Sequence, residues 1–250
     1  MIRLFNGDCM EAFAGMEDNQ YDIAIVDPPF GIGNFVQQST SDGNCRGKKV
    51  TWNDSIPSEA YFAELKRVSK HQIIFGANYY NCFDGKHGAI VWVKNQPMPN
   101  FSKAVIASCT FHKKIELYQQ TWTNFVAEGR CTDHPCEMPV DLYLWLLDNY
   151  AKQGDKILDT HLGSGSIALA CHNMGYDLDA YEINTEYYEN AKNRFPVTIP
   201  KGGSTIAMSY WLSSIPDNAS IQSLLNNLII RITSAVCCAL PNDSWHSHSI

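Results

Sequence analysis

The sequence has no long apolar run and no paired metal ligands. No stretch is apolar for long enough to cross a membrane, and the opening residues MIRLFNGD lack the apolar core of a signal peptide. The nine cysteines are scattered, and none forms a CxxC pair or joins a cluster with zinc-ligand spacing. We therefore expect no membrane span, no metal site, and free thiols in a reducing cytoplasm.

Positive charge is also in short supply. Lys and Arg together number 19 against 26 for Asp and Glu, which gives a formal net charge of −7. This balance argues against a protein coated in basic surface, although a local basic strip is enough to bind nucleic acid. What the chain does have is an ordinary globular composition, with 45% hydrophobic residues across 250 positions. That length suits one large domain, or a domain with an appendage.

Apolar patterns of strand and helix type alternate along most of the chain. Such alternation is typical of an α/β fold with a mainly parallel sheet and helices on its faces. The letters IELYQQTW add one further candidate strand. We expect strands over residues 2–5, 22–26, 72–75 and 89–93, and helices over residues 9–16, 58–69, 139–151, 166–174 and 185–194.

Two internal segments break the alternation. Residues 31–56 form a long polar loop, which we expect to be mobile, and residues 94–130 are irregular. Loops of such length inside a compact domain are usually functional or disordered. Toward the C-terminus the composition changes, so we divide the chain into a main domain, 1–197, and an extension of unknown role, 198–250. An apolar stripe within 221–232 also fits a partner or dimer helix.

A glycine pair lies between a strand and a helix in KILDTHLGSGSIALACHNMG. Gly163 and Gly165 let the backbone approach a ligand closely, and the start of a helix favours negative charge. YDLDAYEIN then predicts a second strand ending at Glu182, whose carboxylate can accept hydrogen bonds from two ribose hydroxyls. The pattern fits NAD and S-adenosylmethionine (AdoMet) alike, and a turn without a ligand is the third reading. Too little chain follows for a standard NAD domain, so the other strands have to come from the N-terminal half.

That half contains YDIAIVDPPF, in which a buried strand delivers Asp27 to its carboxyl end. Ligands of open α/β sheets bind at such ends. Pro28 fixes the backbone so that its carbonyl is held beside the carboxylate, and Phe30 offers a flat face for a base. A carboxylate and a carbonyl that accept the two N–H bonds of an exocyclic amine draw this poor nucleophile toward tetrahedral geometry. Direct methyl transfer from a sulfonium donor then needs positioning and electrostatics, without a covalent intermediate.

Several motifs, in this order, resemble the amino-directed DNA methyltransferases, the N-4/N-6 DNA methylases of bacteria and phages. They are NGDCME, DPPF, FGANYY, an HP…P element at His134, Pro135 and Pro139, and DTHLGSGS…YEIN. Because DPPF precedes the glycine loop, the chain resembles the permuted beta class, over roughly residues 2–195. The resemblance implies a Rossmann-like AdoMet-dependent methyltransferase fold with a mixed, mostly parallel sheet. It also implies a bacterial or phage-infected cell and a restriction-modification setting.

The resemblance implies roles for the matching residues as well. Asp27, Pro28, Pro29 and Phe30 bind the base and catalyse transfer. Asp8 contacts the adenine of AdoMet, and it also has the spacing of a helix N-cap ahead of Glu11. The AdoMet contacts implied in this way are Asp8, Asp27, His134, Pro135, Asp159, His161, Gly163, Gly165, Ser166 and Glu182.

Two residues depart from the family pattern. His161 stands where the family usually has phenylalanine, and we expect a polar residue at the edge of the pocket. Met138 stands where the family commonly has lysine, so no lysine contact is expected there.

The expected partner is double-stranded DNA, from which the target base has to leave the helix to reach Asp27. We place target recognition in residues 94–130; a region this small suggests a short target or help from a second subunit, as in a homodimer.

The aspartate of DPPF favours adenine N6, because relatives that act on cytosine N4 more often begin this motif with serine. Alternatives are a cytosine N4 enzyme, a catalytically silent DNA- or AdoMet-binding protein, an RNA or protein-amide substrate and, more distantly, an NAD oxidoreductase. Candidate DNA contacts are Arg46, Lys48, Lys49, Lys103, Lys113 and Lys114.

Overall fold

The computed structural model describes residues 1–33, 52–83, 85–95, 102–120, 134 and 136–194. Arg46, Lys48, Lys49, Pro135 and the 198–250 extension lie outside the described residues, as does most of the 31–56 loop. The chain divides into the units Met1–Pro196 and Val197–Ile250, and every described residue belongs to the first.

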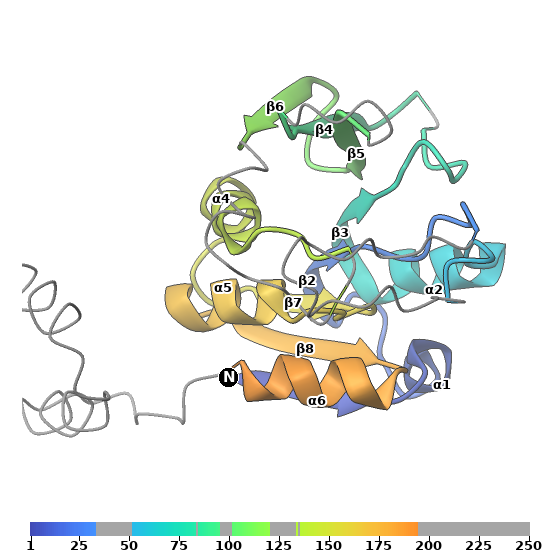
Figure 1. Ribbon diagram of the computed structural model, residues 1–250, viewed down its shortest axis with the longest axis vertical. Helices are drawn as coiled ribbons and strands as arrows, with labels where there is room; N and C mark the ends of the chain where they lie inside the picture. The colour runs from blue at the N-terminus through green and yellow to red at the C-terminus, as the bar shows by residue number, and fades with distance from the viewer. Residues whose placement is uncertain (34–51, 84, 96–101, 121–133, 135, 195–250) are drawn as a thin grey trace, which may run out of the picture. The chain divides into compact units, whose positions relative to one another are not determined.

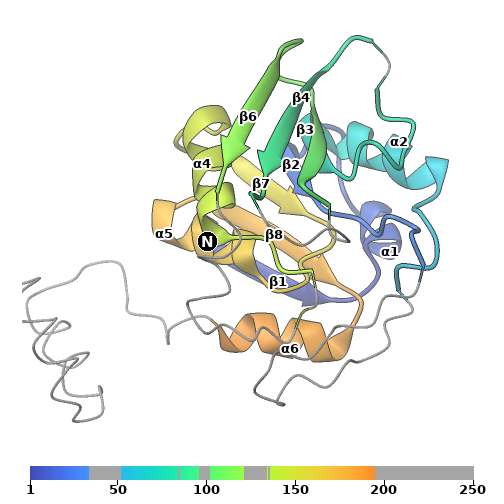
Figure 2. The same ribbon diagram turned by 45° about the horizontal axis from the view of Figure 1, so that its top comes forward.

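The described residues build one eight-stranded sheet with helices on both faces, as Figures 1 and 2 show. The strands, in sheet order, are β1 (Ile2–Asn6), β8 (Asp177–Glu182), β7 (Lys156–Asp159), β2 (Tyr21–Val26), β3 (Ser69–Phe75), β5 (Ala104–Cys109), β4 (Gly88–Val93) and β6 (Ile115–Gln119). The helices are α1 (Cys9–Phe13), α2 (Glu59–Val68), α4 (Val140–Tyr150), α5 (Ser166–Met174) and α6 (Thr185–Asn193).

Only β5 runs against the other described strands. It pairs antiparallel with both β3 and β4, whereas the pairs β1–β8, β8–β7, β7–β2, β2–β3 and β4–β6 are parallel. The carboxyl ends of all the other strands therefore lie at one edge of the sheet, which we call the carboxyl edge. Ligands of open α/β sheets bind at this edge.

The central strands β2, β3 and β7 each contain a buried apolar run because helices cover both faces of the sheet. Ile23 and Ile25 of β2 pack in one core cluster with α4 and α5, and Ala24 and Val26 pack in the other with α1 and α2. Successive strand residues point to opposite faces, which explains this division. In Figure 1, α4 and α5 lie on the opposite side of the strands from α1 and α2. The predicted α/β fold is thus confirmed.

One prediction about the sheet is wrong. Residues 94–130 are not irregular throughout: β6 confirms the candidate strand in IELYQQTW, whereas β5 was not predicted. The strand β5 escapes sequence analysis because its residues AVIASC are mostly small and weakly β-favouring. Its burial comes instead from pairing between β3 and β4, where Ala107, Ser108 and Cys109 are almost fully enclosed.

A membrane span and a metal site are the two features that the sequence leads us not to expect. None of the described helices is long and apolar enough to cross a membrane. Within the described part of the chain, no group of His, Cys, Asp and Glu side chains could hold a metal ion.

Candidate active site

Acidic side chains gather at the carboxyl edge because several strands end there. Asp27 directly follows β2, Asp159 is the last residue of β7, Glu182 is the last residue of β8, and Asp8 comes two residues after β1. Lys94 directly follows β4 at the same edge. The structure therefore brings together the acids that were predicted from separate motifs.

Asp27 holds a carboxylate oxygen without a partner. Its Oδ1 atom is closed off from solvent and has no hydrogen-bond partner among the described residues, although the residue as a whole is only half-buried. Burial raises the pKa of Asp27 to about 7, and the positive charge of Lys94 opposes this rise. Buried polar atoms are normally hydrogen-bonded, so an orphaned acceptor at a strand end is a candidate for binding an incoming donor.

The turn after Asp27 is held by two side chains from other segments. The Tyr80 hydroxyl donates to the carbonyl of Pro28 at 2.6 Å and lies 2.9 Å from that of Pro29. The Asn53 Oδ1 accepts from the amides of Phe30 at 2.7 Å and Gly31 at 3.2 Å. Neither side chain was predicted from the sequence, because nothing in FGANYY indicates a role for its last tyrosine and Asn53 lies in a loop without any pattern.

Phe30 is half-buried and already part of an aromatic group. Its ring stacks on Tyr79 with centroids 5.0 Å apart and an interplanar angle of 14°. Gly76, at a φ of +75°, passes beneath it, and a Cβ there would lie 2.3 Å from the Phe30 ring. One face of the Phe30 ring is thus covered by Tyr79.

The glycine turn is tied to the end of β8. Gly165 caps α5 in the left-handed region, and Gly163 also has a positive φ. The amide of Gly163 donates to one Glu182 carboxylate oxygen at 2.8 Å, and the amide of Asn184 donates to the other at 2.8 Å. Each oxygen keeps a further lone pair, so Glu182 can still accept from a hydroxyl.

His134 lies over the glycine turn. A Cβ on Gly163 would be 3.2 Å from its Nε2 atom. The imidazole stacks on Trp52 and meets Tyr187 edge-on, with centroids 5.7 and 4.6 Å apart. Burial lowers the pKa of His134 to about 4, so the ring is neutral at physiological pH.

A buried ion pair supports the start of α5. Arg194 lies 2.8 Å from Glu137 and donates to the Ser164 carbonyl, while the Ser166 hydroxyl donates to Glu137 at 3.2 Å. Glu137 and Arg194 were not predicted, since each looks like an ordinary charged residue in the sequence. Met138, the departure from the family pattern, is buried in the core.

The other predicted cofactor residues have local hydrogen-bond partners. Asp8 accepts from the Met10 amide at 2.8 Å and so acts as the N-cap of α1. Asp159 accepts from the His161 amide at 2.9 Å, and burial raises its pKa to about 8. The His161 Nδ1 atom lies 2.9 Å from the Thr160 hydroxyl, which anchors the imidazole beside the turn.

The three described lysines among the expected DNA contacts are separated by the sheet. Lys103 precedes the antiparallel strand β5, and its carbonyl accepts from the Lys94 amide at 2.9 Å, so it lies at the carboxyl edge. Lys113 and Lys114 precede β6 and therefore lie at the opposite edge, where Lys114 pairs with Glu116. The sequence could not show this, because the missed strand β5 reverses the chain between them.

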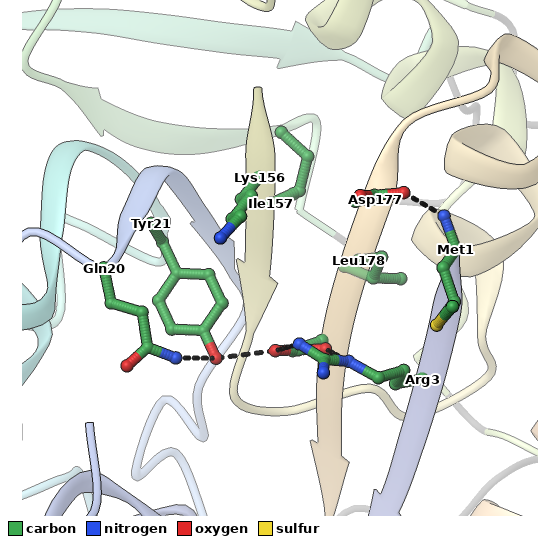
Figure 3. Close-up of a pocket in the computed structure, with 9 residues that line it drawn as sticks. Met1, Arg3, Gln20, Tyr21, Lys156, Ile157, Asp177 and Leu178 are labelled. Carbon is green, nitrogen blue, oxygen red and sulfur yellow. Dashed lines mark hydrogen bonds and ion pairs between the residues drawn. The ribbon is translucent and has the colours of Figure 1, made fainter. Parts of the chain in front are cut away.

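The cavity in Figure 3 also lies away from the acids of the carboxyl edge. It opens between the amino ends of β1, β2, β7 and β8. Asp179 accepts there from Arg3 and from the Tyr21 hydroxyl, and Asp177 pairs with the N-terminal amine of Met1. This cavity is therefore no part of the candidate active site.

The family described as DNA methylase, N6_N4_Mtase, matches residues 110–193. The chain is 21% identical to the type II methyltransferase M.HpaI of Haemophilus parainfluenzae over 233 residues, 77% of this chain and 73% of that protein. It is 22% identical to the type II methyltransferase M2.MboI of Moraxella bovis over 250 residues, 80% of this chain and 89% of that protein.

Two solved structures are similar in fold. The crystal structure of the M1.HpyAVI–SAM complex superposes with a TM-score of 0.53 at 19% identity, covering 78% of this chain and all of that one. The PvuII DNA methyltransferase, described as cytosine-N4-specific, superposes with a TM-score of 0.52 at 13% identity, covering 84% of this chain and 90% of that one. These likenesses support the predicted Rossmann-like methyltransferase fold.

Proposed function

We propose that the chain is an N4/N6 DNA methylase that methylates the exocyclic amine of a DNA base, and that this amine is adenine N6 rather than cytosine N4. The observation that carries the proposal is that the Asp27 Oδ1 atom, which has no partner among the described residues, belongs to the residue just before the Pro28 carbonyl, at the edge that also holds the glycine turn. This is an acceptor pair for the two N–H bonds of an amine.

The chemistry follows from these acceptors. An ionised Asp27 and the Pro28 carbonyl accept the amine hydrogens, which localises the nitrogen lone pair toward the methyl donor. When the nitrogen gains the methyl group it becomes positively charged and has to lose a proton. A carboxylate with a pKa of about 7 can take that proton near neutral pH.

AdoMet is the methyl donor of this family, and the residues of the glycine turn fit it. AdoMet supplies an activated methyl group on a sulfonium sulfur. The Glu182 carboxylate is placed to accept from the ribose, because its oxygens retain lone pairs beside Gly163. We assign Asp8, two residues after β1, to the adenine, because its capping bond to Met10 uses only one carboxylate oxygen.

Adenine is favoured by the aspartate at position 27. Relatives that act on cytosine N4 more often carry serine there, and M1.HpyAVI and the PvuII enzyme share the fold without deciding the base.

On the DNA side we assign phosphate contact to Lys103, which lies at the carboxyl edge, and leave out Lys113 and Lys114. A homodimer and a role for residues 94–130 in target recognition stay predictions.

Nucleoside analysis tests the choice of base. Unmethylated double-stranded DNA is incubated with the protein and labelled AdoMet, digested, and separated by chromatography with mass detection. We expect label in N6-methyldeoxyadenosine. Label in N4-methyldeoxycytidine would transfer the proposal to cytosine, and AdoMet binding without any labelled nucleoside would favour the silent binding protein.

A further inference from the structure

Tyr80 fixes the backbone that the proposed reaction depends on. Its side chain is 7% exposed, and its hydroxyl reaches the carbonyls of Pro28 and Pro29 at 2.6 and 2.9 Å. Any buried tyrosine hydroxyl needs an acceptor. What is specific here is that both acceptors are the carbonyls directly after Asp27, so the hydroxyl acts on the turn that would hold the amine.

The turn after β3 has backbone hydrogen bonds of its own that place Tyr80. Gly76 adopts a φ of +75°, the Tyr79 amide donates to the Gly76 carbonyl at 2.8 Å, and the Ala77 amide donates to Ile106 of β5 at 3.1 Å. The Tyr80 ring packs edge-on to Phe30, with centroids 6.4 Å apart. The segment after β3 thus holds the Tyr80 hydroxyl, which donates to the carbonyls of the turn after β2.

We propose that Tyr80 is a positioning residue for methyl transfer, which aims the Pro28 carbonyl at the target amine. This inference rests on the proposed function. A carbonyl oxygen has two lone pairs, so the bond from Tyr80 leaves one for an N–H of the base. The Asn53 side chain also holds this turn, because its Oδ1 atom accepts hydrogen bonds from the amides of Phe30 and Gly31. Pro28 and Pro29 have no N–H, so the turn cannot make such bonds through their amides.

The variant Tyr80→Phe keeps the ring and removes only the hydroxyl. We expect it to slow single-turnover methylation about 10- to 100-fold, because small displacements of reacting groups have effects of that size. We also expect the AdoMet dissociation constant to change less than about threefold, since the glycine turn is untouched. Tyr79→Phe is the matched control, because it removes a hydroxyl from the same turn, where Tyr79 is 38% exposed and contacts Phe30 by ring stacking.

The outcomes separate this inference from the proposed function. An active wild type and an equally active Tyr80→Phe variant would overturn the role of Tyr80 alone. A variant that loses rate, AdoMet affinity and thermal stability together would show a merely structural residue and would overturn it too. A wild-type chain that binds AdoMet and methylates nothing would contradict the proposed function, and the role of Tyr80 with it.

Discussion

At the scale of single residues, Asp27 and Lys94 form the most informative pair. Sequence analysis found Asp27 because it ends a buried strand before two prolines. It gave no role to Lys94, which lies beyond β4 with its ammonium 4.8 Å from the Trp92 ring centroid. The Asp27 charge raises the pKa of four further groups, namely Tyr80, Cys136, Tyr143 and Asp159. The sheet brings these groups together from distant parts of the chain, so no local pattern could predict that they meet.

The raised pKa of Asp27 predicts a pH dependence of activity. Burial raises this pKa to about 7, and only the ionised carboxylate can accept the amine hydrogens and the departing proton. Single-turnover methylation should therefore rise about tenfold per pH unit below pH ~7 and level off above it. A profile that is flat between about pH 5.5 and 8.5 would contradict an ionised Asp27 as the acceptor.

Lys94 should set the position of that profile. Its positive charge lowers the pKa of Asp27, so the variant Lys94→Met should move the acidic limb to higher pH. Lys152→Met, which removes a charge from an exposed position before β7, is the matched control and should leave the limb in place. Equal profiles for both variants would show that Lys94 has no effect on Asp27.

At the scale of elements, the turns after the strands matter more than the strands. The β2 and β8 ends were readable because an apolar run stops at an acid, and the α5 start because two glycines precede it. The contacts between turns were not readable. Tyr80 to the DPPF turn, His134 over Gly163 and Arg194 to Glu137 each join segments whose proximity depends on strand order.

The turn after β3 offers a test with a built-in control. Gly76 and Gly85 both have a φ of +75°, but a Cβ on Gly76 would lie 2.3 Å from the Phe30 ring, whereas one on Gly85 would meet nothing within 4 Å. Both alanine variants carry the backbone strain, of about 1 kcal/mol. Only Gly76→Ala should add a further loss of roughly 1–3 kcal/mol from overpacking, together with loss of methylation. Chemical denaturation measures the free energy of unfolding of the two variants, and a methylation assay measures their activity. Equal losses of stability would mean that Phe30 moves freely.

At the scale of the whole molecule, the described residues form two hydrophobic clusters of their own. Both hydrophobic clusters lie between Cys9 and Ala191, and the proposed division places the methyltransferase domain at 1–197. We therefore expect a chain that ends at residue 197 to unfold cooperatively and to bind AdoMet within about threefold of the full chain. Calorimetry of both proteins measures this. A shortened chain that fails to fold would make the extension part of the domain.

The most direct test of the account is methyl transfer by Asp27→Ala, with AdoMet binding measured on the same preparation. Unmethylated DNA and labelled AdoMet report the transfer, and titration calorimetry reports the binding. We predict that the wild type transfers label, and that the variant binds AdoMet with a dissociation constant within about threefold but loses transfer by about a thousandfold, the size of effect expected when a charge-stabilising group is removed. An unchanged rate of transfer in the variant would contradict the assignment of Asp27 as the group that receives the amine.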